Sequence, residues 1–120
     1  MSNIVRIAPS NSLILVMDMS IGKIPASMDD SLISATSSCV AVGTLSELDG
    51  ETTISVRDHV ANVGLSLAFD GILDTPTKVL SVCTVKNTEV LAYRVPSTHT
   101  RIQIWVNHPS EPSEIEIVTL

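Results

Sequence analysis

Short apolar runs separated by clusters of turn residues recur along almost the whole chain. The runs cover residues 4–7, 13–19, 39–45, 52–56, 63–69, 79–85, 89–95, 101–106 and 114–118. Runs of this length and spacing are typical of strands joined by short connections, and they leave little room for long helices. The pattern therefore predicts about eight or nine short strands, mainly antiparallel, in an all-β domain.

The last two runs indicate how the predicted strands face solvent. Residues 101–106 and 114–118 alternate apolar side chains with polar or aromatic ones. Because successive side chains of a strand point to opposite faces of the sheet, each run should have one buried and one wet face. The residues on the predicted wet faces are Arg101, Gln103, Trp105, Glu114 and Glu116.

Turn residues mark the predicted connections between these runs. Asp49-Gly50 lies between two apolar runs and predicts a hairpin, since both residue types tolerate positive φ. Asp70-Gly71 predicts another tight turn, directly after the run that ends at residue 69. Residues 86–88 predict the turn of a further hairpin, and the stretch 22–30 is expected to be irregular.

The chain has 120 residues, enough for one hydrophobic core and too few for two ordinary ones, so residues 1–120 are expected to form a single domain. Its only aromatic residues are Phe69, Tyr93 and Trp105. The core must therefore be built from branched aliphatic side chains, which pack well on a pleated sheet. We predict a β-sandwich, with a small β-barrel as the second choice, because both arrangements limit exposed strand edges.

The charge of the chain restricts its partners. At pH 7 the formal net charge is −6, and no basic stripe interrupts the acidic surface. Such a surface repels polyanions, so we expect no nucleic-acid partner, whereas a basic protein would be attracted. We find no export signal and no segment long enough to span a bilayer. We therefore expect a cytoplasmic protein without a membrane partner, in which Cys39 and Cys83 are free, buried thiols.

The sequence carries no local signature of catalysis, metal binding or nucleotide binding. Its five glycines form no phosphate-binding loop, and no serine or cysteine lies in a nucleophile motif. No catalytic residue and no cofactor are therefore predicted. The alternative is a site assembled from separate loops, in which His59, His99 and His108 converge with nearby acids on a metal ion or a small ligand.

Trp105 is the single tryptophan, and alternation places it on one face with Arg101 and Gln103. Tryptophan and arginine are enriched at binding hot spots, and the acidic residues Glu111 and Glu114 follow closely in sequence, so these residues form a candidate interaction patch. The competing interpretation is that a loop covers this face and Trp105 fills a second buried cluster.

Two functions are compatible with these observations. The favoured one is a non-enzymatic binding protein that acts through protein–protein interaction, a class that includes acidic inhibitors and immunity proteins for basic toxins. The alternative is a small enzyme or ligand-binding protein that uses the loop-assembled histidine site. Pairing of two copies through a sheet edge, which would give a homodimer, is compatible with both.

Overall fold

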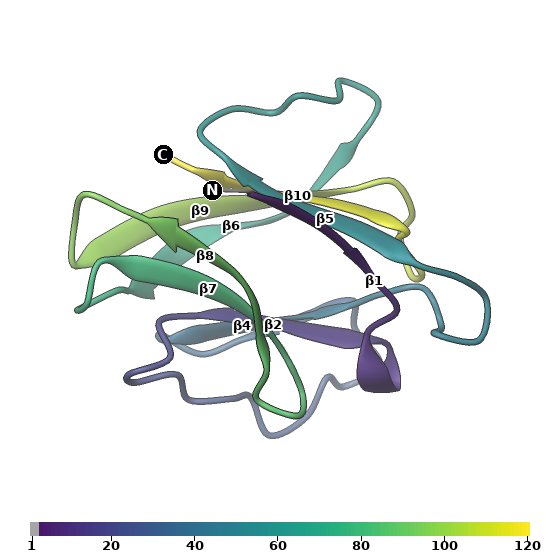
Figure 1. Ribbon diagram of the computed structural model, residues 1–120, viewed down its shortest axis with the longest axis horizontal. Coiled ribbons are helices and arrows are strands. Elements are labelled where there is room, and N and C mark those ends of the chain that lie inside the picture. Colours follow the sequence, from purple (N-terminus) through teal and green to yellow (C-terminus); the bar gives the residue numbers. More distant parts are fainter. Residues whose placement is uncertain (1–2) are drawn as a thin grey trace.

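A computed structural model describes residues 3–120 as two five-stranded β-sheets packed face to face (Figure 1). Sheet A has the strand order β1-β5-β10-β9-β6, and sheet B has the order β3-β4-β2-β7-β8. The strands of sheet A are β1 (Ile4–Ile7), β5 (Thr52–Arg57), β10 (Glu114–Thr119), β9 (His99–Val106) and β6 (Ser66–Asp74). The strands of sheet B are β3 (Ile33–Ala35), β4 (Cys39–Gly43), β2 (Leu13–Met17), β7 (Val79–Thr84) and β8 (Glu89–Arg94). The predicted, mainly antiparallel β-sandwich is confirmed, with ten strands instead of the eight or nine expected.

Helical structure is confined, within residues 3–120, to the 3₁₀ turn Ser10–Ser12 that precedes β2. This part of the chain forms no helix with the length and apolar character needed to cross a membrane. The stretch 22–30 contains neither helix nor strand, as the sequence predicts.

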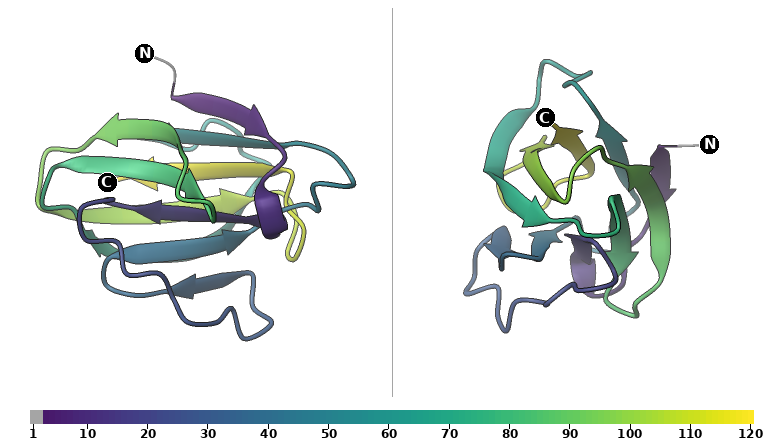
Figure 2. Two further views of the ribbon diagram at one scale, coloured as in Figure 1. Left: turned by 60° about the horizontal axis from the view of Figure 1, so that its bottom comes forward. Right: turned by 90° about the vertical axis from the view of Figure 1, so that its left-hand side faces the viewer.

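The core lies between the two sheets and is built from branched aliphatic side chains. Sheet A and sheet B enclose this layer when the molecule is viewed roughly along the strands (Figure 2, right). Side chains without solvent exposure come from both sheets and are Ile14, Val16, Val40, Val42, Ile54, Leu73, Leu80, Val82, Ile102, Ile104, Ile115 and Ile117. Phe69 and Tyr93 pack against this cluster and are only partly buried. Aliphatic packing therefore holds the two sheets together, as the composition predicts.

A smaller buried cluster lies on the outer face of sheet B. It consists of Leu15, Met17, Cys39, Ala41 and Cys83. Residues 18–32 cover it, with Met28 packed against it and Gly22 so close to Met17 that a Cβ atom would collide with the sulfur. Both cysteines are free and buried, as expected, and burial raises the pKa of each thiol to about 11.

The chain order within sheet A places its last strand in the middle. β10 pairs antiparallel with β9 and parallel with β5, so strands from the two halves of the chain meet there. In sheet B, β7 and β8 form the hairpin that the sequence predicts, and Asn87 in its turn has a φ of 61°. Local hairpins therefore account for only part of the topology.

The hairpin predicted at Asp49-Gly50 is wrong. β4 belongs to sheet B and β5 to sheet A, so the connection between them crosses from one sheet to the other. A local turn is present, because the Asp49 N–H donates to the Ser46 carbonyl (2.9 Å) and Gly50 has a φ of +145°. The connection between β4 and β5 is also bound to the connection between β9 and β10, because the Leu45 N–H donates to the Pro112 carbonyl (2.9 Å). Turn residues thus define the local backbone and do not determine whether the flanking strands pair.

The tight turn predicted at Asp70-Gly71 is also wrong, because β6 runs through both residues. The irregularity in this strand is instead a bulge between Leu67 and Phe69. Gly71 allows the Phe69 ring to pack against the strand, since a Cβ atom at position 71 would lie 2.7 Å from Cζ of that ring. The absence of a side chain at Gly71 leaves room for the ring. Asp70 is thus a strand residue and not a turn residue.

The prediction of a wet face on β10 is only partly right. Alternation places Glu116 correctly on the outer face of sheet A, but the residue is only 3% exposed. The connection between β5 and β6, residues 58–65, folds over it and donates the Ala61 N–H to its carboxylate. This connection rises above sheet A in Figure 1.

Candidate functional site

A row of hydrogen-bonded side chains crosses the outer face of sheet A. The Asp70 carboxylate on β6 accepts hydrogen bonds from Arg101 on β9, through Nε (3.0 Å) and Nη2 (2.8 Å). Gln103 Nε2 donates to the same carboxylate (3.0 Å), and Trp105 Nε1 donates to Gln103 Oε1 (3.2 Å). These four residues, which we call the polar row, connect the three β9 positions that alternation predicts to one residue of β6.

The electrostatics of the polar row keep it ordered. Hydrogen bonds from Arg101 and Gln103 lower the pKa of Asp70 to about 2, so its carboxylate is charged at neutral pH. The same contact raises the pKa of Arg101. Two parallel N–H···O bonds also fix the guanidinium and carboxylate planes relative to each other. The row is therefore arranged before any partner is present.

Apolar side chains of β6 flank the polar row. In the antiparallel register, Leu67 lies opposite Trp105 and Ile72 lies opposite Arg101. Leu67 is 47% exposed and Ile72 is 64% exposed. Trp105 is itself partly exposed and lies outside both buried clusters, so it does not fill the second cluster, which is on sheet B. The open part of this face thus combines an aromatic centre, a fixed ion pair and exposed aliphatic groups.

Residues 58–65 cover the neighbouring part of the same face, over β10 and β5. The Glu116 carboxylate accepts hydrogen bonds from the backbone N–H groups of Ala61 (2.7 Å) and Asn62 (3.1 Å). Asn62 Nδ2 donates to both carboxylate oxygens of Glu114 (3.2 and 3.0 Å). Glu114, a predicted interaction residue, therefore lies on the outer face and holds this covering segment.

Glu111, another predicted interaction residue, lies apart from the polar row. It is exposed in the connection between β9 and β10, where its N–H donates to His108 Nδ1 (2.9 Å). The Ser110 N–H donates to the same nitrogen (3.1 Å). Glu111 thus places an acidic group at one end of the sandwich, beyond the last residue of β9.

The structure does not bring the three histidines together. His59 Nδ1 contacts Asp58 Oδ1 (2.6 Å), and His99 Nε2 contacts Asp74 Oδ1 (3.4 Å). His108 Nδ1 accepts hydrogen bonds from the Ser110 and Glu111 N–H groups of its own turn. Among residues 3–120, no three His, Cys, Asp or Glu side chains gather into a group that could hold a metal ion.

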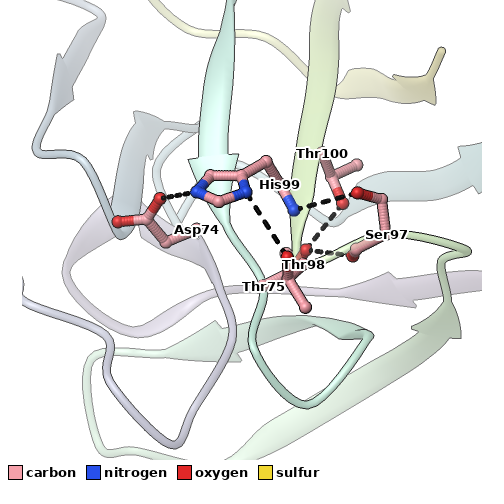
Figure 3. Close-up of polar contacts among 6 residues, drawn as sticks. All are labelled: Asp74, Thr75, Ser97, Thr98, His99 and Thr100. Atoms are coloured by element: carbon pink, nitrogen blue, oxygen red, sulfur yellow. Dashed lines mark hydrogen bonds and ion pairs between the residues drawn. The ribbon is translucent and has the colours of Figure 1, made fainter.

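His99 lies at a polar corner where the end of β6 meets the connection between β8 and β9 (Figure 3). Its ring contacts Asp74 on one side and Thr98 Oγ1 on the other (3.4 Å), while Thr75 Oγ1 and Thr100 Oγ1 are 2.8 Å apart nearby. An acid, an imidazole and a hydroxyl in contact are the components of an activated nucleophile. The His99 and Asp74 side chains are 69% and 41% exposed, however, so water competes for these contacts. We interpret the corner as a solvated turn.

The sequence patterns do not predict Asp70, Leu67 and Ile72 as members of this site. The interpretation of Asp70 as a turn residue hides its cross-strand partner, which is 31 positions away in the chain. A usable signal exists in the alternation of residues 69–73, where odd-numbered positions face the core and even-numbered positions face outward. These residues can be assigned to the surface around the polar row only when the pairing of β6 with β9 is known.

Comparisons with known proteins give one informative similarity. No family model and no curated protein matches the sequence. Among solved structures, the chain is similar to the crystal structure of ComJ from Bacillus subtilis, an inhibitor of the DNA-degrading activity of NucA. The TM-score is 0.66 at 8% sequence identity, and the match covers 99% of this chain and 96% of ComJ. The two chains therefore share a fold over essentially their whole length.

Proposed function

We propose that this chain is a non-enzymatic inhibitor that binds a basic, DNA-degrading enzyme through the open outer face of sheet A. The observation that carries the proposal is the polar row, an ordered Arg101–Asp70–Gln103–Trp105 chain with exposed aliphatic neighbours. It lies on a fold that, in ComJ, belongs to an inhibitor of DNA degradation.

The composition of this face is that of a binding surface. Tryptophan and arginine contribute most often to interface hot spots, and aliphatic side chains around them exclude water from the contact. Trp105 and Arg101 are held by hydrogen bonds to Gln103 and Asp70, so a partner meets side chains whose conformational freedom is already reduced. Association then costs less entropy than it would with mobile side chains.

The charge of the chain favours a partner that itself binds DNA. An enzyme that degrades DNA must present basic groups to the phosphate backbone. A chain of net charge −6 is attracted to such a surface and competes with the polyanion for it. Glu111 and the other exposed acids contribute to this attraction at long range, whereas the polar row supplies the short-range contacts.

A DNA-degradation assay tests the proposal. The purified chain is titrated into plasmid digestion by NucA and by any nuclease encoded beside its own gene. We expect inhibition of at least one of these enzymes at near-stoichiometric concentration. Trp105→Ala should raise the concentration needed by about 30-fold, the loss typical of one hot-spot residue, and the variant should keep its fold by circular dichroism.

Ile24→Ala is the matched control for the tryptophan variant. Ile24 is 52% exposed and lies in the segment that covers sheet B, on the opposite side of the sandwich. This variant should inhibit as well as the unaltered chain. Absence of inhibition by the folded chain, or a loss confined to Ile24→Ala, would contradict the proposal.

A further inference from the structure

β6 presents an open strand edge beside the polar row. It is the outermost strand of sheet A, and within residues 3–120 no strand pairs with its second edge (Figure 2, right). Ser66, Leu67, Ala68, Asp70 and Ile72 are all exposed. Folded proteins usually keep such edges short, charged or covered, because an open edge is a template for another strand. A nine-residue edge strand with exposed aliphatic side chains is therefore an unusual surface.

The backbone of β6 shows which groups face this edge. The Asp74 N–H donates to the Ser37 carbonyl (2.9 Å), in the connection between β3 and β4, so it points away from β9. Because the backbone direction of a strand repeats every second residue, the N–H and C=O groups of Ile72 and Asp70 point the same way. Ser37 thus closes the edge at its end, and residues 66–72 leave it open.

A groove lies beside the first residues of β6, 66–68, at the open edge. It has a volume of about 330 Å³ and is lined by Leu32, Leu67, Ala68, Val106 and Pro109 together with the polar residues Ser66, Asn107 and His108. Leu32 directly precedes β3, the edge strand of sheet B, so the groove lies between the open edges of the two sheets. Alternate side chains of a strand added to β6 would enter it, while the others would lie over Leu67 and Ile72.

We propose that the β6 edge takes up an extended, basic segment of the inhibited enzyme as an additional strand of sheet A. This inference rests on the proposed function and specifies how the partner docks. The net charge of −6 favours a basic segment, and Glu111 lies in the β9–β10 connection that supplies Pro109 to the groove, whereas the charge of Asp70 is already paired with Arg101. A second copy of the chain is disfavoured as occupant, because it would bring together two molecules of net charge −6.

Main-chain hydrogen bonds would carry the affinity in this mode, and the groove would select the side chains. The added strand would also extend the surface around Trp105, since Leu67 lies opposite Trp105 in the register. Docking at the edge and contact with the polar row would therefore occur in one interface.

Ile72→Pro tests the edge, because proline removes an N–H donor and keeps an extended backbone. Arg101, which lies opposite Ile72, uses its C=O to bind the Leu120 N–H on the side away from β6, so no bond between β6 and β9 is lost. The matched control, Ile72→Thr, keeps the N–H. We expect Ile72→Pro to weaken inhibition by more than about tenfold and Ile72→Thr by less than about threefold, with similar melting temperatures.

A defined peptide makes the test independent of the enzyme. The probe is a capped nine-residue peptide of alternating valine and lysine, compared with one of alternating valine and glutamate. Amide NMR signals of β6 should shift with the lysine peptide only, and Ile72→Pro should abolish the shift. If this occurs while no nuclease is inhibited, the proposed function fails and the docking edge stands.

Three results would overturn the inference. Full inhibition by Ile72→Pro would show that the enzyme binds elsewhere, and would leave the proposed function intact. Peptide-induced shifts confined to other strands would exclude the β6 edge. Concentration-dependent dimerisation that Ile72→Pro abolishes, measured by analytical ultracentrifugation, would identify a second copy as the occupant.

Discussion

The outer faces of the two sheets differ in what covers them. The outer face of sheet B is apolar, and residues 18–32 cover its buried cluster. On sheet A, residues 58–65 cover only the β10 and β5 part, and the polar row on β9 and β6 stays accessible. In a sandwich of two sheets that share one core, the chemistry of each outer face thus decides whether it is used for packing or left for recognition.

The two outer faces also differ in the role of their carboxylates. Asp18 is 1% exposed and begins the segment that covers sheet B, where it accepts bonds from N and Oγ of Ser20 (3.0 and 2.7 Å). It also accepts bonds from N and Oγ1 of Thr77 (2.8 and 2.6 Å). Glu116 anchors the cover of sheet A with two backbone bonds, whereas Asp70 anchors no covering segment and orders the exposed polar row. Buried carboxylates fix the covers, and the exposed one arranges a surface.

Removing the Asp18 carboxylate should have the largest effect. Asp18→Ala leaves the Ser20 and Thr77 N–H groups without their acceptor. Hydrogen bonds to a charged group contribute more to stability than hydrogen bonds between neutral groups. We expect the free energy of unfolding to fall by about 3 kcal/mol, measured by urea denaturation. Inhibition by the remaining folded protein should be unchanged. A loss below about 1 kcal/mol would show that solvent satisfies these donors and that the cover does not depend on Asp18.

Removing the Glu116 carboxylate should have the next largest effect. Glu116→Ala deprives residues 58–65 of the acceptor for Ala61 and Asn62 and should cost about 2 kcal/mol. Hydrogen exchange of these two amides should accelerate more than that of β9. Equal acceleration in both regions would mean that the cover and the open face unfold together, which would remove the distinction drawn between them.

The fall in stability at low pH should show the contribution of the buried Asp18 carboxylate. Burial raises the pKa of Asp18, but the hydrogen bonds from Thr77 and Ser20 outweigh burial and bring the pKa below 3.8. The stabilisation is therefore complete above the pKa of the unfolded chain, about 4, and is lost as pH falls through the lower pKa of the folded chain. Unfolding free energies measured from pH 5 to pH 2 should fall less steeply in Asp18→Asn than in the unaltered protein.

Added salt should distinguish the contribution of Asp70 to the pH dependence of stability from that of Asp18. Asp70 also has a lowered pKa, caused by Arg101 and then Gln103, but its ion pair is exposed. Added sodium chloride should therefore reduce the part of the acid response that Asp70→Asn removes and should leave the Asp18 part intact. Equal salt sensitivity of the two parts would contradict the assignment of Asp18 to a buried structural role.

The smallest effect on stability is expected for Asp70→Asn at neutral pH. The variant loses the ion pair with Arg101 on an open surface, so the melting temperature should change by less than about 2 °C. Inhibition should weaken by about tenfold, because Gln103 and Trp105 are no longer tied to Arg101. A large fall in melting temperature with full inhibition would assign the polar row to folding instead of binding.

Features of the fold that depend on neighbouring residues in the chain are predictable from the sequence. Ile4–Ile7 is predicted with the bounds that the structure has, and Glu89–Arg94 within one residue, because aliphatic and β-branched residues pack on a pleated surface. Alternation also places Arg101, Gln103 and Trp105 on one face of β9. These features depend on neighbours in the sequence and need no knowledge of strand order.

The errors arise where distant segments meet. Asp49 and Asp70 both precede a glycine, yet one lies in a connection between sheets and the other inside a strand. Glu116 has the alternation of a solvated residue and is buried by a segment more than fifty positions earlier in the chain. Pairing of β6 with β9 and the folding of residues 58–65 over β10 are tertiary facts, so local propensity does not predict them.

The central position of β10 has a consequence for how the protein folds. Sheet B can form from residues 13–94, but sheet A lacks its middle strand until residues 114–119 are available. Before that point β5 and β9 have no common neighbour. Parallel pairing across such a separation closes a long loop, which is entropically costly and slow. Completion of sheet A should therefore depend on this late, long-range pairing of residues 114–119 with β5.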